Sequence, residues 1–191
     1  MVTTKNSRAD VIAAAGRLFS QKGYHGTSMR DLGRELGLLG SSLYAHVDSK
    51  QDLLVEVVEA GGQLFQASAD AAIQVEGSAE ARLRALIDGH IEVVLENVDV
   101  ARTFLNEARD LDHEHREKVL KARDAYESAF RAVIAEGRDD GSFRDDVDPK
   151  TAAIFILSIL NAIERWYRPG GRLDRARLVD EVTAFVESGL T

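Results

Sequence analysis

The 191-residue sequence contains no cysteine, which excludes a disulfide framework, a thiolate metal site and a cysteine nucleophile. Prolines are also few, Pro149 and Pro169, and no stretch shows the polar–apolar alternation of a half-buried strand. The longest apolar run, residues 154–160, is interrupted by a serine and is too short to cross a bilayer. Polar residues near the N-terminus interrupt any signal peptide. We therefore expect a cytoplasmic protein without membrane contact.

The residues that are present form an ordinary globular composition in which charge is unevenly distributed. Hydrophobic residues make up 45% of the chain and charged residues 29%, enough for one or two domains with a real core. The net charge is −8, but residues 1–50 contain seven Lys/Arg and four Asp/Glu, so they carry +3 and the remainder −11. A basic head on an acidic body is expected when only the head meets a polyanion, although a solvated face gives the same excess.

Helical spacing of apolar residues runs through the whole chain and predicts an all-α fold. Helix starts are indicated where a serine precedes an aspartate by three residues, as at Ser7, Ser28 and Ser49, and where Asp148 precedes Pro149. The predicted helices are residues 7–23, 28–37, about 40–46, 49 to beyond 64, 78–97, 99–108, 113–136, 151–167 and 174–188. The fold is therefore expected to contain a small three-helix head and a larger helical body.

Two features of these predicted helices bear on how they pack. The helix at residues 151–167 is apolar on nearly all sides, so we expect it to be buried all round. The fourth helix contains Gly61 and Gly62 near its middle. Glycine pairs permit bending, which suits a lever between head and body, and they equally permit close approach of another helix. Both interpretations of the pair remain open from sequence.

The stretch LGLLGSSLYAHVDSKQDLL, residues 36–54, places a short turn between the second helix and a short third one. This spacing is typical of a helix-turn-helix, whose second helix enters the DNA major groove. Small serines on that helix would let its backbone approach the bases, and the nearby ring-bearing and basic side chains would contact phosphates. A helical corner with a buried tyrosine has the same spacing, so the pattern alone favours neither.

Residues 11–54 resemble the DNA-binding domain of TetR-type repressors over nearly fifty residues. FSQKGYHGTSMRDLGRELGLLGSSLYAHVDSKQDLL follows the family pattern of an aromatic–Gly turn, a capped second helix, a Ser/Thr-Leu-Tyr segment and a final Ser-Lys-x-x-Leu. Leu39 and Val47 depart from the commonest family residues. The resemblance implies a homodimeric repressor that binds a palindromic operator in double-stranded DNA. It also implies that DNA is contacted or approached by Thr27, Ser28, Ser41, Ser42, Tyr44, His46 and Lys50.

The resemblance divides the chain into a DNA-binding domain, residues 1–50, and a ligand-binding and dimerisation domain, residues 51–191. The last two helices would pair with those of a second subunit through Ile154, Ile156, Leu157, Leu160, Ile163, Leu178, Val182, Phe185 and Val186, although burial within a monomer is the alternative. An effector cavity is expected among the helices of residues 78–167. Its candidate lining residues, for each of which core packing is the alternative role, are Phe65, His90, Leu95, Phe104, Tyr126, Phe130, Asn161 and Trp166.

The segment FRDDVDPKTAAIFILSILNAIERWYRPGGRLD resembles the C-terminal part of a TetR subgroup that controls fatty-acid and steroid degradation. That subgroup often carries a W-Y-R-P-G-G stretch and commonly responds to acyl-CoA esters. The resemblance implies a small hydrophobic effector, with an acyl-CoA as the candidate. Arg165, Arg168 and Arg172 would supply cations for its phosphates, with surface salt bridging as the alternative.

An all-helical metal-binding enzyme is the main competing class. Residues 110–117, DLDHEHRE, contain two histidines among several carboxylates, and His113 with Glu117 has the spacing of one helical turn. Helical di-iron proteins use Glu-x-x-His, however, and no histidine here has a glutamate three residues before it. The sequence also lacks a G-x-S-x-G or a Gly-rich phosphate loop. We therefore expect no catalytic residues, no metal and no cofactor.

Overall fold

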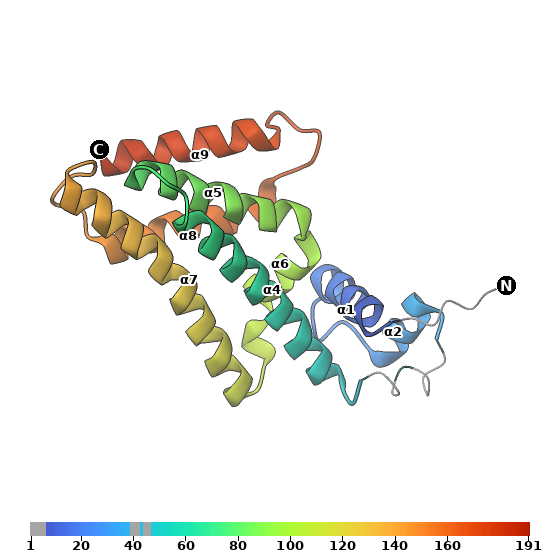
Figure 1. The fold of residues 1–191 in the computed structure, drawn as a ribbon. Coiled ribbons are helices and arrows are strands. Elements are labelled where there is room, and N and C mark those ends of the chain that lie inside the picture. Colours follow the sequence, from blue (N-terminus) through green and yellow to red (C-terminus); the bar gives the residue numbers. More distant parts are fainter. Residues whose placement is uncertain (1–6, 39–42, 44–46) are drawn as a thin grey trace. The chain divides into compact units, whose positions relative to one another are not determined.

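The computed structural model describes residues 7–38, 43 and 47–191, and every regular element in this part of the chain is a helix. The elements are α1 (Arg8–Lys22), α2 (Met29–Leu36), α4 (Lys50–Ile73), α5 (Ala79–Glu96), α6 (Val98–Asn106), the short 3-10 helix η1 (Ala108–Asp110), α7 (His113–Asp140), α8 (Pro149–Trp166) and α9 (Arg175–Leu190) (Figure 1). The predicted all-α fold is confirmed. Most of the predicted third helix lies outside the described residues. Among the described helices, none is long and apolar enough to span a membrane.

Local capping chemistry explains where most of these helices begin and end. Ser7 and Ser28 each form a capping box with the aspartate three residues later, as predicted. Asp148 accepts a hydrogen bond from the backbone of Thr151 at 2.9 Å, and proline occupies the first turn of α8. Gly37 ends α2 with a left-handed backbone, φ 65°, which glycine adopts without steric cost. The sequence therefore determines these boundaries locally.

The chain packs as two compact units that do not follow its order. The first unit comprises Met1–Gln63 and Asp99–Leu120, and the second comprises Leu64–Val98 and Lys121–Thr191. Helices α4 and α7 each contribute residues to both units. The helix-turn-helix region therefore shares its unit with α6, which is distant from it in sequence.

The first unit has an apolar core built from the inward faces of α1, α2 and the start of α4, with α6 packed closely on α4. Leu43 and Val47 are buried, so the valine at this family position serves as a core residue. A Cβ atom at Gly61 would lie 2.7 Å from Cβ of Phe104, and one at Gly62 would lie 3.3 Å from the Phe104 ring. Of the two interpretations of the glycine pair, the geometry supports close packing between α4 and α6.

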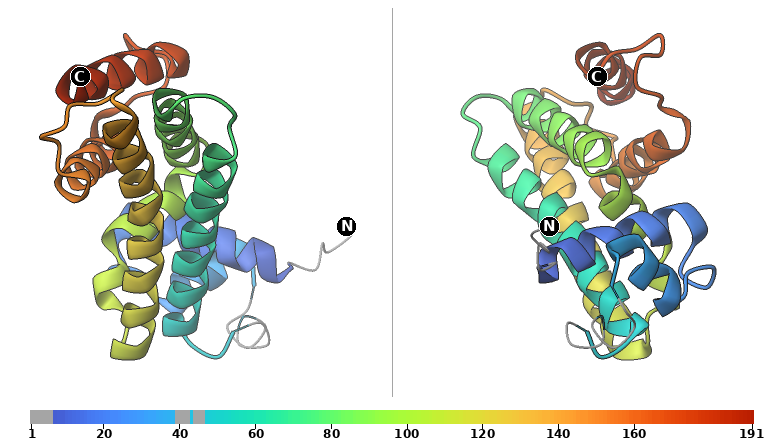
Figure 2. Two further views of the ribbon diagram at one scale, coloured as in Figure 1. Left: turned by 60° about the vertical axis from the view of Figure 1, so that its left-hand side comes forward. Right: turned by 90° about the vertical axis from the view of Figure 1, so that its right-hand side faces the viewer.

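In the second unit α5 packs against both α8 and α9, and Figure 2 shows these helices lying together. Ion pairs join α5 to α9: Arg175 contacts Asp88 at 2.7 Å and Glu92 at 2.9 Å, and Arg84 contacts Asp180. Such exposed pairs contribute little free energy each. Burial of the apolar faces of these helices therefore contributes more to the stability of this unit than the ion pairs do.

The prediction that the helix at residues 151–167 is buried on all sides is wrong for the single chain. Ile156, Leu160 and Ile163 on one face of α8 are buried, but Phe155 on another face is 64% exposed and Trp166 is 50% exposed. A helix that is apolar all round needs covering on every face, and this chain covers only one of them. The remaining face presents an apolar surface to solvent in the isolated subunit.

Candidate functional site

The turn between α1 and α2 is closed by Lys50, the first residue of α4. Its ammonium donates hydrogen bonds to the carbonyl oxygens of Tyr24 and Thr27, both at 2.9 Å, and lies 4.1 Å from the centre of the Tyr24 ring. The Tyr24 hydroxyl donates in turn to Gln51 at 2.9 Å. Lys50 was predicted to contact phosphate, and the structure places it on the turn that leads into α2. Sequence reasoning missed Tyr24, whose partners are distant in the chain.

Thr27 and Ser28, two of the predicted DNA-binding residues, lie at the start of α2 with different environments. Thr27 is buried, and its hydroxyl interacts with the carbonyl oxygens of Gly23 at 3.0 Å and Leu18 at 3.2 Å. Ser28 caps α2, and its own backbone N–H donates to Asp31 at 3.0 Å. Hydrogen bonds from the hydroxyl and the backbone of Ser28 lower the pKa of the Asp31 carboxyl. Thr27 therefore fixes the turn, whereas Ser28 stays at the exposed helix end.

The remaining predicted DNA-binding residues are Ser41, Ser42, Tyr44 and His46, and all four lie outside the described residues. Their roles as groove-reading or phosphate-contacting residues stay predictions. The described neighbours on either side, Leu43 and Val47, are buried in the core of the first unit.

Residues that follow α6 are bonded directly to the α1–α2 turn within the first unit. Glu107 accepts a hydrogen bond from the backbone N–H of Tyr24 at 3.0 Å, and His25 Nε2 lies 3.2 Å from Asp110 Oδ1. Thr103 on α6 is fully buried and donates to the carbonyl of Asp99 at 2.8 Å. A displacement of Glu107 and η1 would therefore disturb the turn that precedes α2.

Four of the predicted effector-binding residues come together in the second unit. Phe65 on α4, His90 on α5, and Tyr126 and Phe130 on α7 are all buried. The Phe65 ring centre lies 4.9 Å from that of His90 and 5.5 Å from that of Tyr126, which is 5.5 Å from that of Phe130. We call these four residues the aromatic cluster. Its members are 65 residues apart at the extremes, so the fold, and not local sequence, assembles it.

A polar pair lies inside this aromatic cluster. His90 Nδ1 is 3.0 Å from the Tyr126 hydroxyl, while within the described residues the buried His90 Nε2 has no hydrogen-bond partner. Complete burial lowers the pKa of His90 to about 3, so the imidazole is neutral at physiological pH. Burial raises the pKa of Tyr126, which keeps its phenol protonated. An unpaired buried polar atom costs roughly 1–3 kcal/mol.

Three other predicted effector-binding residues, and Leu95, are not members of the aromatic cluster. Phe104 belongs to the first unit, where its ring packs on Gly61 and Gly62. Asn161 is half-buried on α8, and Trp166 at the end of that helix has half its surface exposed. Leu95 is half-buried near the end of α5. Asn161 and Leu95 therefore stay candidates for the effector site, while Phe104 belongs to a different unit from the aromatic cluster.

The three candidate arginines lie at or beyond the end of α8. Arg165 Nε lies 3.4 Å from the buried carboxylate of Glu164, and Arg168 donates to the backbone oxygens of Arg165 at 3.1 Å and Tyr167 at 2.8 Å. Arg165, Arg168 and Arg172 are all exposed. They therefore place positive charge beside Trp166 at the surface of the second unit.

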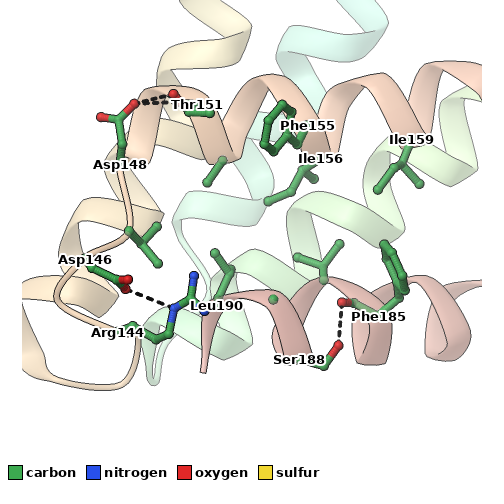
Figure 3. Close-up of a pocket in the computed structure, with 14 residues that line it drawn as sticks. Arg144, Asp146, Asp148, Thr151, Phe155, Ile156, Ile159, Phe185, Ser188 and Leu190 are labelled. Atoms are coloured by element: carbon green, nitrogen blue, oxygen red, sulfur yellow. Dashed lines mark hydrogen bonds and ion pairs between the residues drawn. The ribbon is translucent and has the colours of Figure 1, made fainter.

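An apolar groove of about 550 Å³ lies between α8 and α9, and Figure 3 shows its lining. Phe155 and Phe185 stand on its two sides and are 64% and 67% exposed. Arg144 and Asp146, 3.1 Å apart, lie at one end. Of the residues predicted to pair with a second subunit, Ile156, Leu160, Ile163, Leu178, Val182 and Val186 are buried within this chain, whereas Ile154 and Phe185 are exposed. Sequence reasoning missed Phe155, because burial of the whole helix was expected.

The histidine-rich segment that motivated the metalloenzyme alternative forms local ion pairs. His115 Nδ1 lies 2.7 Å from Asp112 Oδ2, and His113 lies 3.8 Å from Glu117 on the same face of α7. Among the described residues, no three histidine, aspartate or glutamate side chains are grouped closely enough to hold a metal ion. The first pair caps the start of α7, since Asp112 also accepts from the backbone N–H of His115 at 3.0 Å.

Comparisons with known proteins cover nearly the whole chain. A family model described as bacterial regulatory proteins, tetR family, matches residues 11–57, and one described as tetracyclin repressor-like, C-terminal domain, matches residues 76–190. The HTH-type transcriptional repressor KstR2 of Rhodococcus jostii (strain RHA1) is 28% identical over 96% of this chain and 90% of its own length.

Solved structures give the same result. The TetR family transcriptional regulator PfmR of Thermus thermophilus is 31% identical, with a TM-score of 0.86 over 95% of this chain and 98% of its own. The structure of AibR in complex with isovaleryl coenzyme A and operator DNA is 25% identical, with a TM-score of 0.86 over 93% of this chain and 96% of its own. Both halves of the sequence therefore match one architecture, and the chain belongs to the TetR family of bacterial transcriptional regulators.

Proposed function

We propose that this regulator is a homodimeric repressor that leaves its operator when an acyl-CoA ester enters the second unit. The observation that carries the effector assignment is the aromatic cluster, in which buried apolar rings surround a single polar ring pair. Small-molecule sites in proteins have this composition, mostly apolar with a few fixed polar groups. The similarity to AibR, which was solved with isovaleryl coenzyme A and operator DNA, supports the same ligand class.

DNA binding is assigned to the head, residues 1–50, and effector binding and dimerisation to residues 51–191. In the DNA complex Ser41 and Ser42 face the major groove, while Tyr44, His46 and Lys50 contact phosphates beside the end of α2 that Ser28 caps. Lys50 has a further role in this proposal, because its bonds to the α1–α2 turn couple α4 to α2.

Effector recognition is divided between an apolar and a charged region of the second unit. The acyl chain lies against Phe65 and Phe130 of the aromatic cluster, where burial of its methylene groups supplies most of the affinity. Exposed Arg165, Arg168 and Arg172 provide cations for the phosphates of coenzyme A, and Trp166 offers an aromatic face beside them. Free coenzyme A then lacks the apolar part of the interaction, and a free fatty acid lacks the charged part.

Release of DNA requires the effector to bind the DNA-incompetent arrangement more tightly than the competent one. Helix α4 provides the connection in this proposal, because it carries Phe65 in the aromatic cluster and Lys50 at the α1–α2 turn. An acyl chain that displaces Phe65 shifts α4 along its length. The shifted Lys50 then displaces the α1–α2 turn to which it is bonded. As a result, the reading helices of the two subunits no longer have the separation that the two operator half-sites require.

Dimerisation is assigned to the groove between α8 and α9, whose exposed Phe155 and Phe185 would be covered by the same helices of a second subunit. A two-fold symmetric pair matches a palindromic operator. A regulator of this kind works where the chromosome lies, so we assign it to the cytoplasm.

The proposal is tested with fluorescently labelled DNA from upstream of the protein's own gene. Fluorescence anisotropy should show binding of the protein, and acyl-CoA esters of graded length and branching should reverse it. Free coenzyme A and the free acids are the matched controls and should leave the complex intact. Persistence of the complex at saturating concentrations of every ester would overturn the effector class, while failure to bind that DNA at all would direct attention to other operators.

A further inference from the structure

Among the described histidines, His90 alone is completely buried, and its two ring nitrogens have different environments. Nδ1 faces the Tyr126 hydroxyl at 3.0 Å. Within the described residues Nε2 has no partner, although it too is removed from solvent. Buried polar atoms in native proteins are nearly always paired, so an unpaired nitrogen in an otherwise apolar lining needs an explanation.

The proton positions in this pair follow from the relative strengths of its donors and acceptors. The Ser68 hydroxyl donates its proton to the carbonyl of Phe65 at 2.8 Å. A phenol O–H is a stronger donor than a neutral imidazole N–H, and an imidazole nitrogen is a stronger acceptor than a phenol oxygen. The Tyr126 O–H therefore donates to His90 Nδ1. The ring must then carry its own proton on Nε2, which makes Nε2 a donor.

We propose that His90 Nε2–H donates a hydrogen bond to the acyl carbonyl oxygen of the effector, with Tyr126 as the positioning residue that fixes the tautomer. This inference rests on the proposed function and adds the polar atom by which the effector is read. The aromatic rings of Phe65 and Phe130 accept any apolar chain of suitable shape, so they select poorly between chains. His90 instead selects for an oxygen at the position where the chain joins its head group.

The consequence is a preference between two coenzyme A derivatives of the same length and charge. An acyl-CoA thioester has a carbonyl group next to its sulfur, whereas the corresponding S-alkyl-CoA thioether has a methylene group at that position and so has no acceptor oxygen there. A site that offers a buried donor rejects the analogue without the acceptor, because the donor is then left unpaired. The wild-type protein should therefore bind the thioester about tenfold more tightly than the thioether.

The experiment measures both affinities by isothermal titration calorimetry for wild-type protein and for His90→Phe, which keeps an aromatic ring but has no nitrogen. The preference for the thioester should fall from about tenfold to about onefold in His90→Phe. Phe130→Leu is the matched control: it reshapes the same lining without changing its polarity, so both affinities should change while their ratio stays near the wild-type value. An unchanged ratio in His90→Phe overturns the inference while leaving the effector class intact. Binding of neither derivative to wild-type protein overturns the proposed effector class and this inference together.

The tautomer supplies a second measurement that needs no ligand and no large change in the core. In protein labelled with nitrogen-15 at its five histidines, the resonances absent from His90→Phe belong to His90. Their chemical shifts should identify Nε2 as protonated and Nδ1 as unprotonated, and Tyr126→Phe should move the ring away from this single tautomer and reduce the thioester preference. Protonated Nδ1 in the wild-type protein would overturn the donor assignment, whatever the two ligand affinities show.

Discussion

Single side chains stabilise the first unit. Lys50 contacts three groups of the α1–α2 turn, namely two backbone carbonyls and the Tyr24 ring. Replacing Lys50 by methionine keeps the length of the side chain but removes two charge-assisted hydrogen bonds and the contact with the Tyr24 ring. Loss of such bonds at a partly buried site should lower the free energy of unfolding by about 1–3 kcal/mol. Urea denaturation followed by circular dichroism measures this change.

Lys22, an exposed lysine in the last turn of α1, provides the control for Lys50. Lys22→Met should alter the unfolding free energy by less than about 0.5 kcal/mol. If Lys50 also reaches a phosphate in the complex, Lys50→Met flattens the slope of log K against log salt by about one unit. Equal stability of the two variants would show that the carbonyl contacts contribute nothing, and an unchanged slope would remove Lys50 from the DNA.

His90 makes a specific contribution to the pH dependence of stability. Its pKa is about 3 in the folded protein and about 6.5 in an unfolded chain, so between these values the unfolded state binds a proton that the folded state does not. Lowering the pH through this window therefore destabilises the fold, by up to about 1.4 kcal/mol per pH unit. His90→Phe should remove that part of the slope in denaturation measured from pH 7 to pH 4. Phe130→Leu is the control: it changes the packing around His90 but removes no titratable group, so it should retain the wild-type slope.

At the scale of helices, the packing of α6 on α4 depends on the glycine pair. A methyl group at Gly61 would lie 2.7 Å from Cβ of Phe104 and 3.2 Å from the carbonyl of Val100, so Gly61→Ala must push the two helices apart. Overpacking of this kind costs about 1–3 kcal/mol, more than the roughly 1 kcal/mol that alanine gains in helix propensity. The melting temperature of Gly61→Ala should therefore fall.

Gly16→Ala on α1 is the matched control, because a Cβ atom there would make ordinary contacts, 3.5 Å from Val57 and 3.6 Å from Val100. It should leave the melting temperature unchanged or raise it slightly, through helix propensity alone. A Gly61→Ala protein as stable as the parent would mean that α6 can move away from α4 without a loss of stability. It would then favour the bending interpretation of the glycine pair.

The helices were predictable from sequence where local chemistry decides them. These local signals act within a few residues, so they can be recognised from the sequence alone. They are the capping boxes at Ser7 and Ser28, the Asp148–Pro149 start and the glycine end of α2. The interpretation of the glycine pair was open because it depends on Phe104, more than forty residues away. The exposed face of α8 was mispredicted because periodicity reports that a face is apolar and not what covers it.

At the scale of the whole molecule, the candidate site was only partly predictable. The aromatic residues of the cluster were identifiable as buried and bulky, but their grouping required the contacts between α4, α5 and α7. Phe104 and Trp166 have the same residue chemistry as Phe65 and Phe130, yet the fold places Phe104 in the other unit and leaves Trp166 half exposed. The pairing of His90 with Tyr126, 36 residues apart, has no local signal at all. Site chemistry is therefore readable from residue types, whereas site membership is a property of the tertiary structure.

Assembly of the repressor should depend on the apolar groove between α8 and α9. Phe155 and Phe185 expose about two thirds of their surfaces there, at 64% and 67%, an arrangement that suits burial against a symmetric copy. Replacing both by arginine places like charges face to face in such an interface. Sedimentation equilibrium should then show a monomer, and affinity for a palindromic operator should fall by at least about a hundredfold, because the two half-sites are no longer bound by one linked pair of heads.

Leu120→Arg changes an exposed leucine elsewhere, 57% accessible on α7, and should remain dimeric with full operator affinity. A dimeric Phe155→Arg/Phe185→Arg protein would show that the subunits associate through a different surface.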